Sequence, residues 1–152
     1  MANKKLRYPL ITAGVALLSF LALGTEPAVA HKEKHTAEQL DAFEQAFMEQ
    51  VKIGDQLFHG DGDTQKRLNV SLSKTGMACA MCHPYSSDTH AQEFPKFQEQ
   101  MSSFATLRNM INWCIEKPNE GEKIDPDGAA MKALEAYIYW SNRNSKLDPG
   151  RH

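Results

Sequence analysis

Residues 79–83 of this 152-residue chain read Cys79-Ala80-Met81-Cys82-His83. A Cys-X-X-Cys-His spacing lets one helical turn present two thiols to one edge of a porphyrin, and the adjacent imidazole can then bind the iron. A thioredoxin-like redox pair would need a surrounding βαβ pattern, and a zinc site would need a second pair of cysteines or a nearby pair of histidines; the sequence has neither. The motif therefore predicts one covalently attached haem c, with Cys79 and Cys82 forming the thioether bonds and His83 as the proximal axial ligand.

The beginning of the chain has the three parts of a secretory signal in order. Positive charge at residues 4–7 precedes an almost entirely apolar run at residues 10–23, and Ala28-Val29-Ala30 offers the small residues that a signal peptidase reads. The alternative is an uncleaved membrane anchor, but the run is shorter than the roughly 20 residues of a spanning helix. We therefore predict a cleaved signal peptide over residues 1–30. The mature domain, residues 31–152, is then expected in the periplasm or another extracytoplasmic compartment, with no stable membrane span.

The charges of the chain are mixed and nearly balanced. There are 17 lysines and arginines against 19 aspartates and glutamates, which gives a net charge of −2. A nucleic-acid-binding domain would carry a basic patch or stripe, and none is seen in the sequence. We therefore expect no nucleic acid among the partners.

Helical periodicity is clearest in the segment before the Cys-X-X-Cys-His motif. Thr36 and Gln39 have the spacing of a capping box and predict a helix over residues 37–58. Its expected apolar stripe comprises Leu40, Phe43, Phe47 and Val51. A polar loop is predicted for residues 64–76.

Two further helical segments follow the motif. Apolar side chains and a cysteine share one helical face in the first of them: Leu107, Met110, Ile111 and Cys114. The last helix is expected to start after Asp127 as its cap, and the tail from Asn144 is expected to be disordered. With no convincing strand, the chain is predicted to be all-α, with four to five helices wrapped around one covalent haem.

The second axial position of the iron is not determined by the motif. An unpaired Cys114 in an oxidising compartment would be bound to the iron, buried and inert, or paired with another chain. The remaining candidates are the methionines and histidines elsewhere in the mature chain: Met101, Met110, Met131, His31, His35, His59, His90 and His152. From the residues alone Cys114 is the sharpest candidate, and the alternatives, above all Met110 and Met131, stay open.

Several short stretches resemble known cytochromes. Gly54 with Leu57-Phe58 resembles the first-helix signature of class I cytochromes c, and Tyr137, Tyr139 and Trp140 resemble the aromatic cluster of their last helix. This resemblance implies the class I cytochrome c fold, in which the glycine lets the first helix cross closely over the last.

A second resemblance concerns a subgroup of these cytochromes. Phe94-Pro95-Lys96-Phe97, followed by LRNMINWCIEKP at residues 107–118, resembles cytochromes with His/Cys-ligated haem: thiosulfate dehydrogenases, SoxA-type subunits and NaxLS-type cytochromes of anaerobic ammonium oxidisers. The resemblance implies that Cys114 is the distal axial ligand and that the haem has a low reduction potential.

The number of haem motifs distinguishes among these relatives. Thiosulfate dehydrogenases typically carry two haems, whereas this chain has one Cys-X-X-Cys-His motif and looks most like one subunit of the NaxLS type. That resemblance implies a heterodimer with a second small c-type cytochrome, and binding of nitric oxide or carbon monoxide. We expect an electron-transfer or gas-binding haem protein with a redox partner protein, rather than an enzyme. The alternatives are a His/Met-ligated electron carrier and a haem subunit of a thiosulfate- or sulfur-oxidising enzyme.

Overall fold

Helices predominate in the computed structural model, which describes residues 34–150. The main helices are α1 (Ala37–Phe58), α2 (Gly62–Arg67), α3 (Cys79–Cys82), α4 (Leu107–Glu116) and α5 (Ala129–Ser141). Short 3-10 helices occupy Ser86–Thr89, Ala91–Glu93 and Glu99–Met101. Residues from His35 onward belong to one compact unit. The signal peptide predicted over residues 1–30 lies outside the described residues, so it remains a prediction; no described helix is long and apolar enough to span a bilayer.

Helix α1 has the predicted bounds, and its start shows the predicted capping box. The Thr36 hydroxyl accepts a hydrogen bond from the Gln39 backbone N–H at 3.2 Å, and the Gln39 side chain accepts one from the Thr36 N–H at 2.9 Å. Two of the otherwise unpaired donors of the first turn are thus satisfied. The helix ends at Phe58, ahead of a turn in which Gly60 has a φ of 83°.

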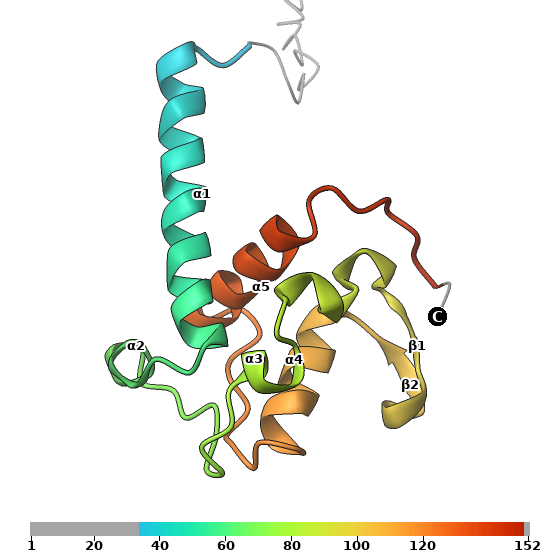
Figure 1. Cartoon of the computed structure of the whole chain (residues 1–152). Helices are drawn as coiled ribbons and strands as arrows, with labels where there is room; N and C mark the ends of the chain where they lie inside the picture. Colours follow the sequence, from blue (N-terminus) through green and yellow to red (C-terminus); the bar gives the residue numbers. More distant parts are fainter. Residues whose placement is uncertain (1–33, 151–152) are drawn as a thin grey trace, which may run out of the picture. The chain divides into compact units, whose positions relative to one another are not determined.

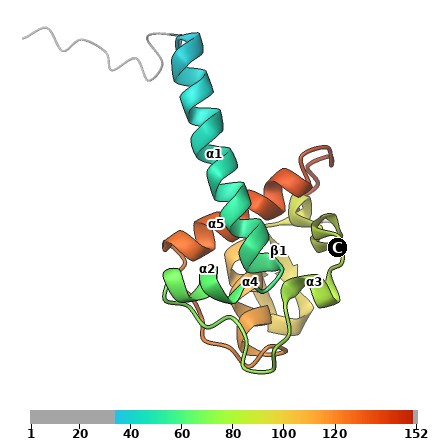
Figure 2. The same ribbon diagram turned by 60° about the vertical axis from the view of Figure 1, so that its left-hand side comes forward.

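The crossing of α1 over α5 requires a glycine. In Figures 1 and 2 the lower half of α1 lies across α5, and the contact centres on Gly54. A Cβ at Gly54 would lie 2.0 Å from the Ala133 carbonyl oxygen, closer than any two such atoms can approach. Below this point the rings of Phe58 and Tyr137 pack with their centroids 5.3 Å apart. The expected close crossing of the first and last helices is therefore present.

The apolar stripe predicted for α1 has two environments. Val51 is buried against the rest of the unit, together with Gly54, Leu57 and Phe58. Nearer the amino-terminus, Leu40, Phe43 and Phe47 continue the same stripe but are exposed, with Phe43 retaining 54% of its accessible surface. Figure 1 shows this upper half of α1 away from α5. The periodicity predicted the helix correctly, but among the described residues Val51 is the one member of the four-residue stripe that is buried.

Three of the local predictions are wrong. Residues 64–76 are not entirely loop, because α2 starts at Gly62 with the Asp61 carboxylate accepting a hydrogen bond from the Thr64 N–H at 2.7 Å. An antiparallel hairpin of β1 (Lys96–Gln98) and β2 (Ser103–Ala105) forms where no strand was predicted. The N-cap of α5 is Gly128 instead of Asp127.

Residues 148–150 are also more ordered than predicted. The Asp148 N–H donates to the Gln92 carbonyl at 3.0 Å, and the Gly150 N–H donates to the Glu93 carbonyl at 3.0 Å. These bonds hold residues 148–150 against the 3-10 helix Ala91–Glu93. The tail is polar, so its periodicity carried no signal, and its order comes from main-chain pairing with a distant segment.

The hydrophobic core lies between α5, α4 and the lower end of α1. Its largest fully buried side chains are Leu57, Phe58, Ile115, Met131 and Leu134. Cys79, Ala80 and Met110 pack against this core while remaining partly accessible. The core therefore extends directly to the residues that the sequence singled out.

Candidate haem site

A cavity of about 350 Å³ brings together the Cys-X-X-Cys-His motif and α4. Its lining includes Cys79, Cys82 and His83 from α3 and its end, and Met110 and Cys114 from α4. The apolar part of the wall comprises Phe58, Phe94, Leu107, Ile111, Leu134 and Ile138. All four residues predicted to bind haem thus line one cavity, although Cys114 is 31 positions beyond His83 in the sequence.

The α3 wall is a single helical turn. The His83 N–H donates to the Cys79 carbonyl at 2.9 Å, and no side chain caps the start of the turn. Cys79 is half-buried and Cys82 is exposed, and neither forms a disulfide. Burial raises the pKa of the Cys79 thiol to about 11. The turn therefore offers one thiol from within the cavity and one from its rim.

The α4 wall presents Leu107, Met110, Ile111 and Cys114, the face predicted from their spacing. Burial, together with smaller contributions from Cys79 and Cys82, raises the pKa of the Cys114 thiol to about 11. All three cysteines line the same cavity. A nearby cation such as a metal ion acts in the opposite direction and favours the thiolate.

The other candidate ligands separate into two groups. Met110 and His90 line the cavity, whereas Met101 and Met131 do not; Met131 is fully buried in α5. His59 is paired with Asp55 at 3.0 Å outside the cavity. His35 also lies elsewhere, against the Phe43 ring. His31 and His152 are outside the described residues. Among the described residues, the cavity therefore has two candidate axial ligands besides Cys114, namely Met110 and His90.

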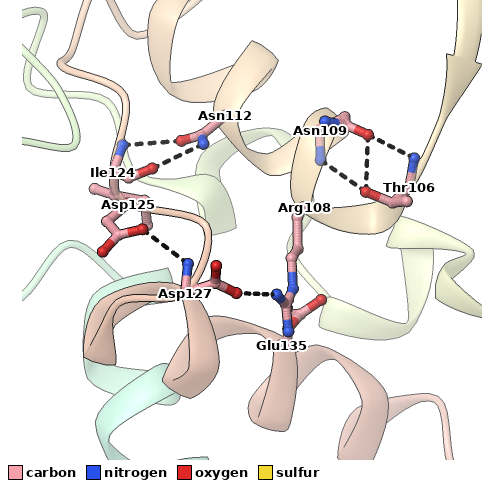
Figure 3. Close-up of polar contacts among 8 residues, drawn as sticks. All are labelled: Thr106, Arg108, Asn109, Asn112, Ile124, Asp125, Asp127 and Glu135. Carbon is pink, nitrogen blue, oxygen red and sulfur yellow. Dashed lines mark hydrogen bonds and ion pairs between the residues drawn. The ribbon is translucent and has the colours of Figure 1, made fainter.

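Helix α4 is anchored at its start by a capping box. The Asn109 N–H donates to the Thr106 hydroxyl oxygen at 3.3 Å, and the Thr106 N–H donates to the Asn109 side-chain oxygen at 2.9 Å. Further along, the Asn112 amide pairs with both backbone groups of the buried Ile124, each at 2.9 Å (Figure 3). These bonds attach the helix that carries Cys114 to the loop preceding α5.

A second anchor connects α4 with α5 directly. The Arg108 guanidinium donates to Glu135 and to Asp127, both at 2.9 Å (Figure 3). Glu135 and Asp127 in turn raise the pKa of Arg108, so it remains charged. Arg108 and Glu135 are 27 positions apart, and nothing in the sequence indicated this pairing. The residues that orient the α4 wall were therefore missed by the sequence analysis.

The donor set and the walls fit a covalently bound haem. The apolar side chains suit the macrocycle, two thiols and an imidazole stand at one wall, and a polar wall is formed by Lys96, Gln98 and Gln100. Gln98 Oε1 is buried and has no hydrogen-bond partner among the described residues. A purely apolar ligand would leave such a polar wall without a function.

Comparison with known proteins agrees with this fit. Residues 65–147 match the family of the SoxA/TsdA cytochrome c domain. Among solved structures, the chain is similar to the thiosulfate dehydrogenase (TsdBA) of Marichromatium purpuratum in its "as isolated" form, with 21% identity and a TM-score of 0.52. The match covers 69% of this chain but 26% of that one. No curated protein matches the chain. The likeness confirms the expected class I cytochrome c fold, and the family implies covalently bound haem c.

Proposed function

This chain belongs to the SoxA/TsdA cytochrome c domain family, and we propose that it is an exported, low-potential electron-transfer cytochrome with His83/Cys114 haem ligation. Haem c supplies one-electron redox chemistry when bound. In this proposal Cys79 and Cys82 hold the haem covalently and His83 is its proximal ligand. The periplasm or another extracytoplasmic compartment is the expected location.

The position of Cys114 carries the proposal. It lines the same cavity as Cys79, Cys82 and His83, and it is presented by a helix that Arg108 and Asn112 attach to its surroundings. An anchored helix holds a ligand at a fixed distance, which a covalent cofactor on the opposite wall requires. A thiolate donates negative charge and favours ferric iron, so Cys114 is expected to lower the reduction potential.

Spectroscopy of a matched pair of variants tests the ligation. In Cys114→Ala, the ferric magnetic-resonance and optical spectra should lose the thiolate signature while the haem remains covalently attached. Met110→Leu alters the neighbouring turn of the same helical face and should leave the signature unchanged. Unchanged spectra in Cys114→Ala would exclude His/Cys ligation, and a change confined to Met110→Leu would establish His/Met ligation instead.

We also propose a gas-binding role for the same site. Nitric oxide or carbon monoxide would compete with Cys114 for the distal position, whereas the covalent attachment at Cys79 and Cys82 would hold the haem in place. Carbon monoxide should therefore bind the reduced Cys114→Ala protein more tightly than the reduced wild type. Equal affinities would mean that Cys114 does not compete with the gas for the distal position.

The partner is proposed to be a second small c-type cytochrome that forms a heterodimer with this chain, as in NaxLS-type proteins. The similar region is about a quarter of the solved thiosulfate dehydrogenase chain, so most of that chain lies outside the match. A redox partner on a separate chain would supply a second haem. Purification of the native protein, followed by haem staining of its separated subunits, tests this partnership.

A sulfur-oxidising enzyme is the second candidate, favoured by the family match. In that case this chain would be the haem subunit and Cys114 would face the sulfur substrate. Addition of thiosulfate to the purified complex would then reduce its haem. Absence of thiosulfate-dependent reduction in the intact complex would leave electron transfer as the function.

A further inference from the structure

Strand β1 turns two polar side chains toward the cavity. Lys96 and Gln98 line it, whereas Phe97 between them is 60% exposed, as expected where side chains alternate across a strand. Gln100 continues the polar wall beyond the strand, and the Gln98 amide donates a hydrogen bond to it. This wall differs from the apolar side chains that line most of the cavity.

Lys96 is nearly buried although it carries a charge. Its side chain is 12% exposed, and its ammonium lies 2.7 Å from Glu93 Oε2 and 5.2 Å from the centre of the Phe94 ring. A buried ammonium is costly unless acceptors surround it. It has three N–H donors, and Glu93 is the one hydrogen-bond acceptor found for it among the described residues. Lys96 can therefore bind a further acceptor inside the cavity.

The chemistry of haem places two carboxylates at the edge opposite the vinyl groups. With Cys79 and Cys82 holding the vinyl edge at α3, the carboxylates would point away from α3. In Figure 1 the hairpin lies well apart from α3, although residues of both line the cavity. Among the residues that line the cavity in the described part of the chain, Lys96 is the one lysine or arginine. Lys96 is therefore the cation that would face the carboxylate edge of a haem attached at α3.

We propose that Lys96 binds a propionate carboxylate of the haem, with Glu93 positioning its ammonium and the Gln98 amide completing the polar wall. This inference rests on the proposed placement of haem between α3 and α4. Lys96 would donate one N–H to Glu93 and another to the propionate. The Glu93 side chain is 10% exposed, so it holds the lysine from the protein side of the cavity.

Two other titratable groups line the same cavity as Lys96, and the test must account for them. His90 and Asp88 line the cavity, and His90 Nδ1 lies 3.7 Å from Glu93 Oε1. The remaining titratable groups of the lining are the four residues assigned to haem binding. Because the His90 imidazole lies close to Glu93 and can carry a positive charge, a His90→Gln variant must accompany the lysine variants.

The experiment measures the midpoint potential of the covalent holoprotein as a function of pH. In Lys96→Gln, loss of the cation raises the pKa of the propionate, so the pH range over which the potential falls should move up by about one unit or more. Lys96→Arg keeps the charge and should stay close to the wild type. Lys132→Gln, a change of an exposed lysine on α5, is the matched control and should leave the profile unchanged. The shift should persist when His90 is also replaced by Gln.

Infrared spectroscopy supplies a readout that a merely structural lysine would not alter. Redox-difference spectra of the protein with isotope-labelled haem carboxylates should show a shifted propionate band in Lys96→Gln. If that variant does not accumulate, Glu93→Gln replaces it. Removing the competing carboxylate should move the pH range down, and an unchanged or raised range would overturn the proposal.

The outcomes separate this inference from the proposed function. Covalent haem with an unchanged pH profile and unchanged propionate bands in Lys96→Gln overturns the role of Lys96 alone. Haem attachment that survives loss of both Cys79 and Cys82 overturns the proposed placement of the haem itself. Both measurements use the full-length holoprotein.

Discussion

The two walls of the cavity, α3 and α4, are built in opposite ways. Helix α3 is four residues long, has no side-chain cap and contains no buried residue. Helix α4 is ten residues long, begins with a capping box and buries Leu107, Ile111 and Ile115. A single turn such as α3 has little intrinsic helical stability, whereas α4 is supported by packing and by polar anchors.

This difference indicates where each wall obtains its geometry. The predicted haem-binding residues at α3, Cys79, Cys82 and His83, lie within five consecutive positions, so their arrangement is local. Covalent attachment of the haem would add the rigidity that a single helical turn does not have. Cys114 has no such local context. Its position depends on α5 and on the loop before it, through Arg108 and Asn112. Substitutions in the two walls should therefore have different consequences.

The largest expected effect comes from α3. Replacing both Cys79 and Cys82 with Ser should abolish covalent haem attachment, because no thiol remains for either thioether bond. Haem staining and the mass of the denatured protein check this result. The matched control, Cys114→Ser in the opposite wall, should retain the covalent haem. Covalent haem in the double variant would contradict the assignment of Cys79 and Cys82 as the attachment residues.

Loss of a large apolar side chain should lower the free energy of unfolding more in α4 than in α3. Ile115→Ala in α4 removes a side chain that is 1% exposed, and should lower the free energy of unfolding by about 2–5 kcal/mol. Met81→Ala in α3 removes one that is 66% exposed, and should change that free energy by no more than about 0.5 kcal/mol. Denaturant unfolding of the two holoproteins measures the difference, and equal losses would contradict it.

The smallest of the three effects concerns a polar anchor of α4. Asn112→Ala leaves both backbone groups of the buried Ile124 without their partners, and should cost about 1–3 kcal/mol of unfolding free energy. Because the anchor holds the helix that carries Cys114, the ferric spectrum should also broaden or shift. Lys132→Gln, an exposed change on α5, is the control. A destabilised variant with an unaltered spectrum would show that the anchor supports the fold without positioning Cys114.

Strong local signals made parts of the fold predictable. The capping box at Thr36 and the apolar repeat located α1 at residues 37–58, and the spacing of Leu107 and Cys114 identified the cavity-facing side of α4. Weak local signals failed elsewhere. The three-residue strands of the hairpin are too short to show alternation, and Asp127 pairs with Arg108 instead of capping α5.

The sequence by itself predicted the residues for haem attachment and determined the long helix, because both depend on neighbours within a few positions. Only the tertiary structure decided which residues share the cavity. It brought Cys114, Met110 and Lys96 to the motif and excluded Met131 from the cavity, and it left three of the four α1 stripe residues exposed. The physical reason is that a helical period specifies which side chains share a face. What covers that face depends on contacts with segments many residues away.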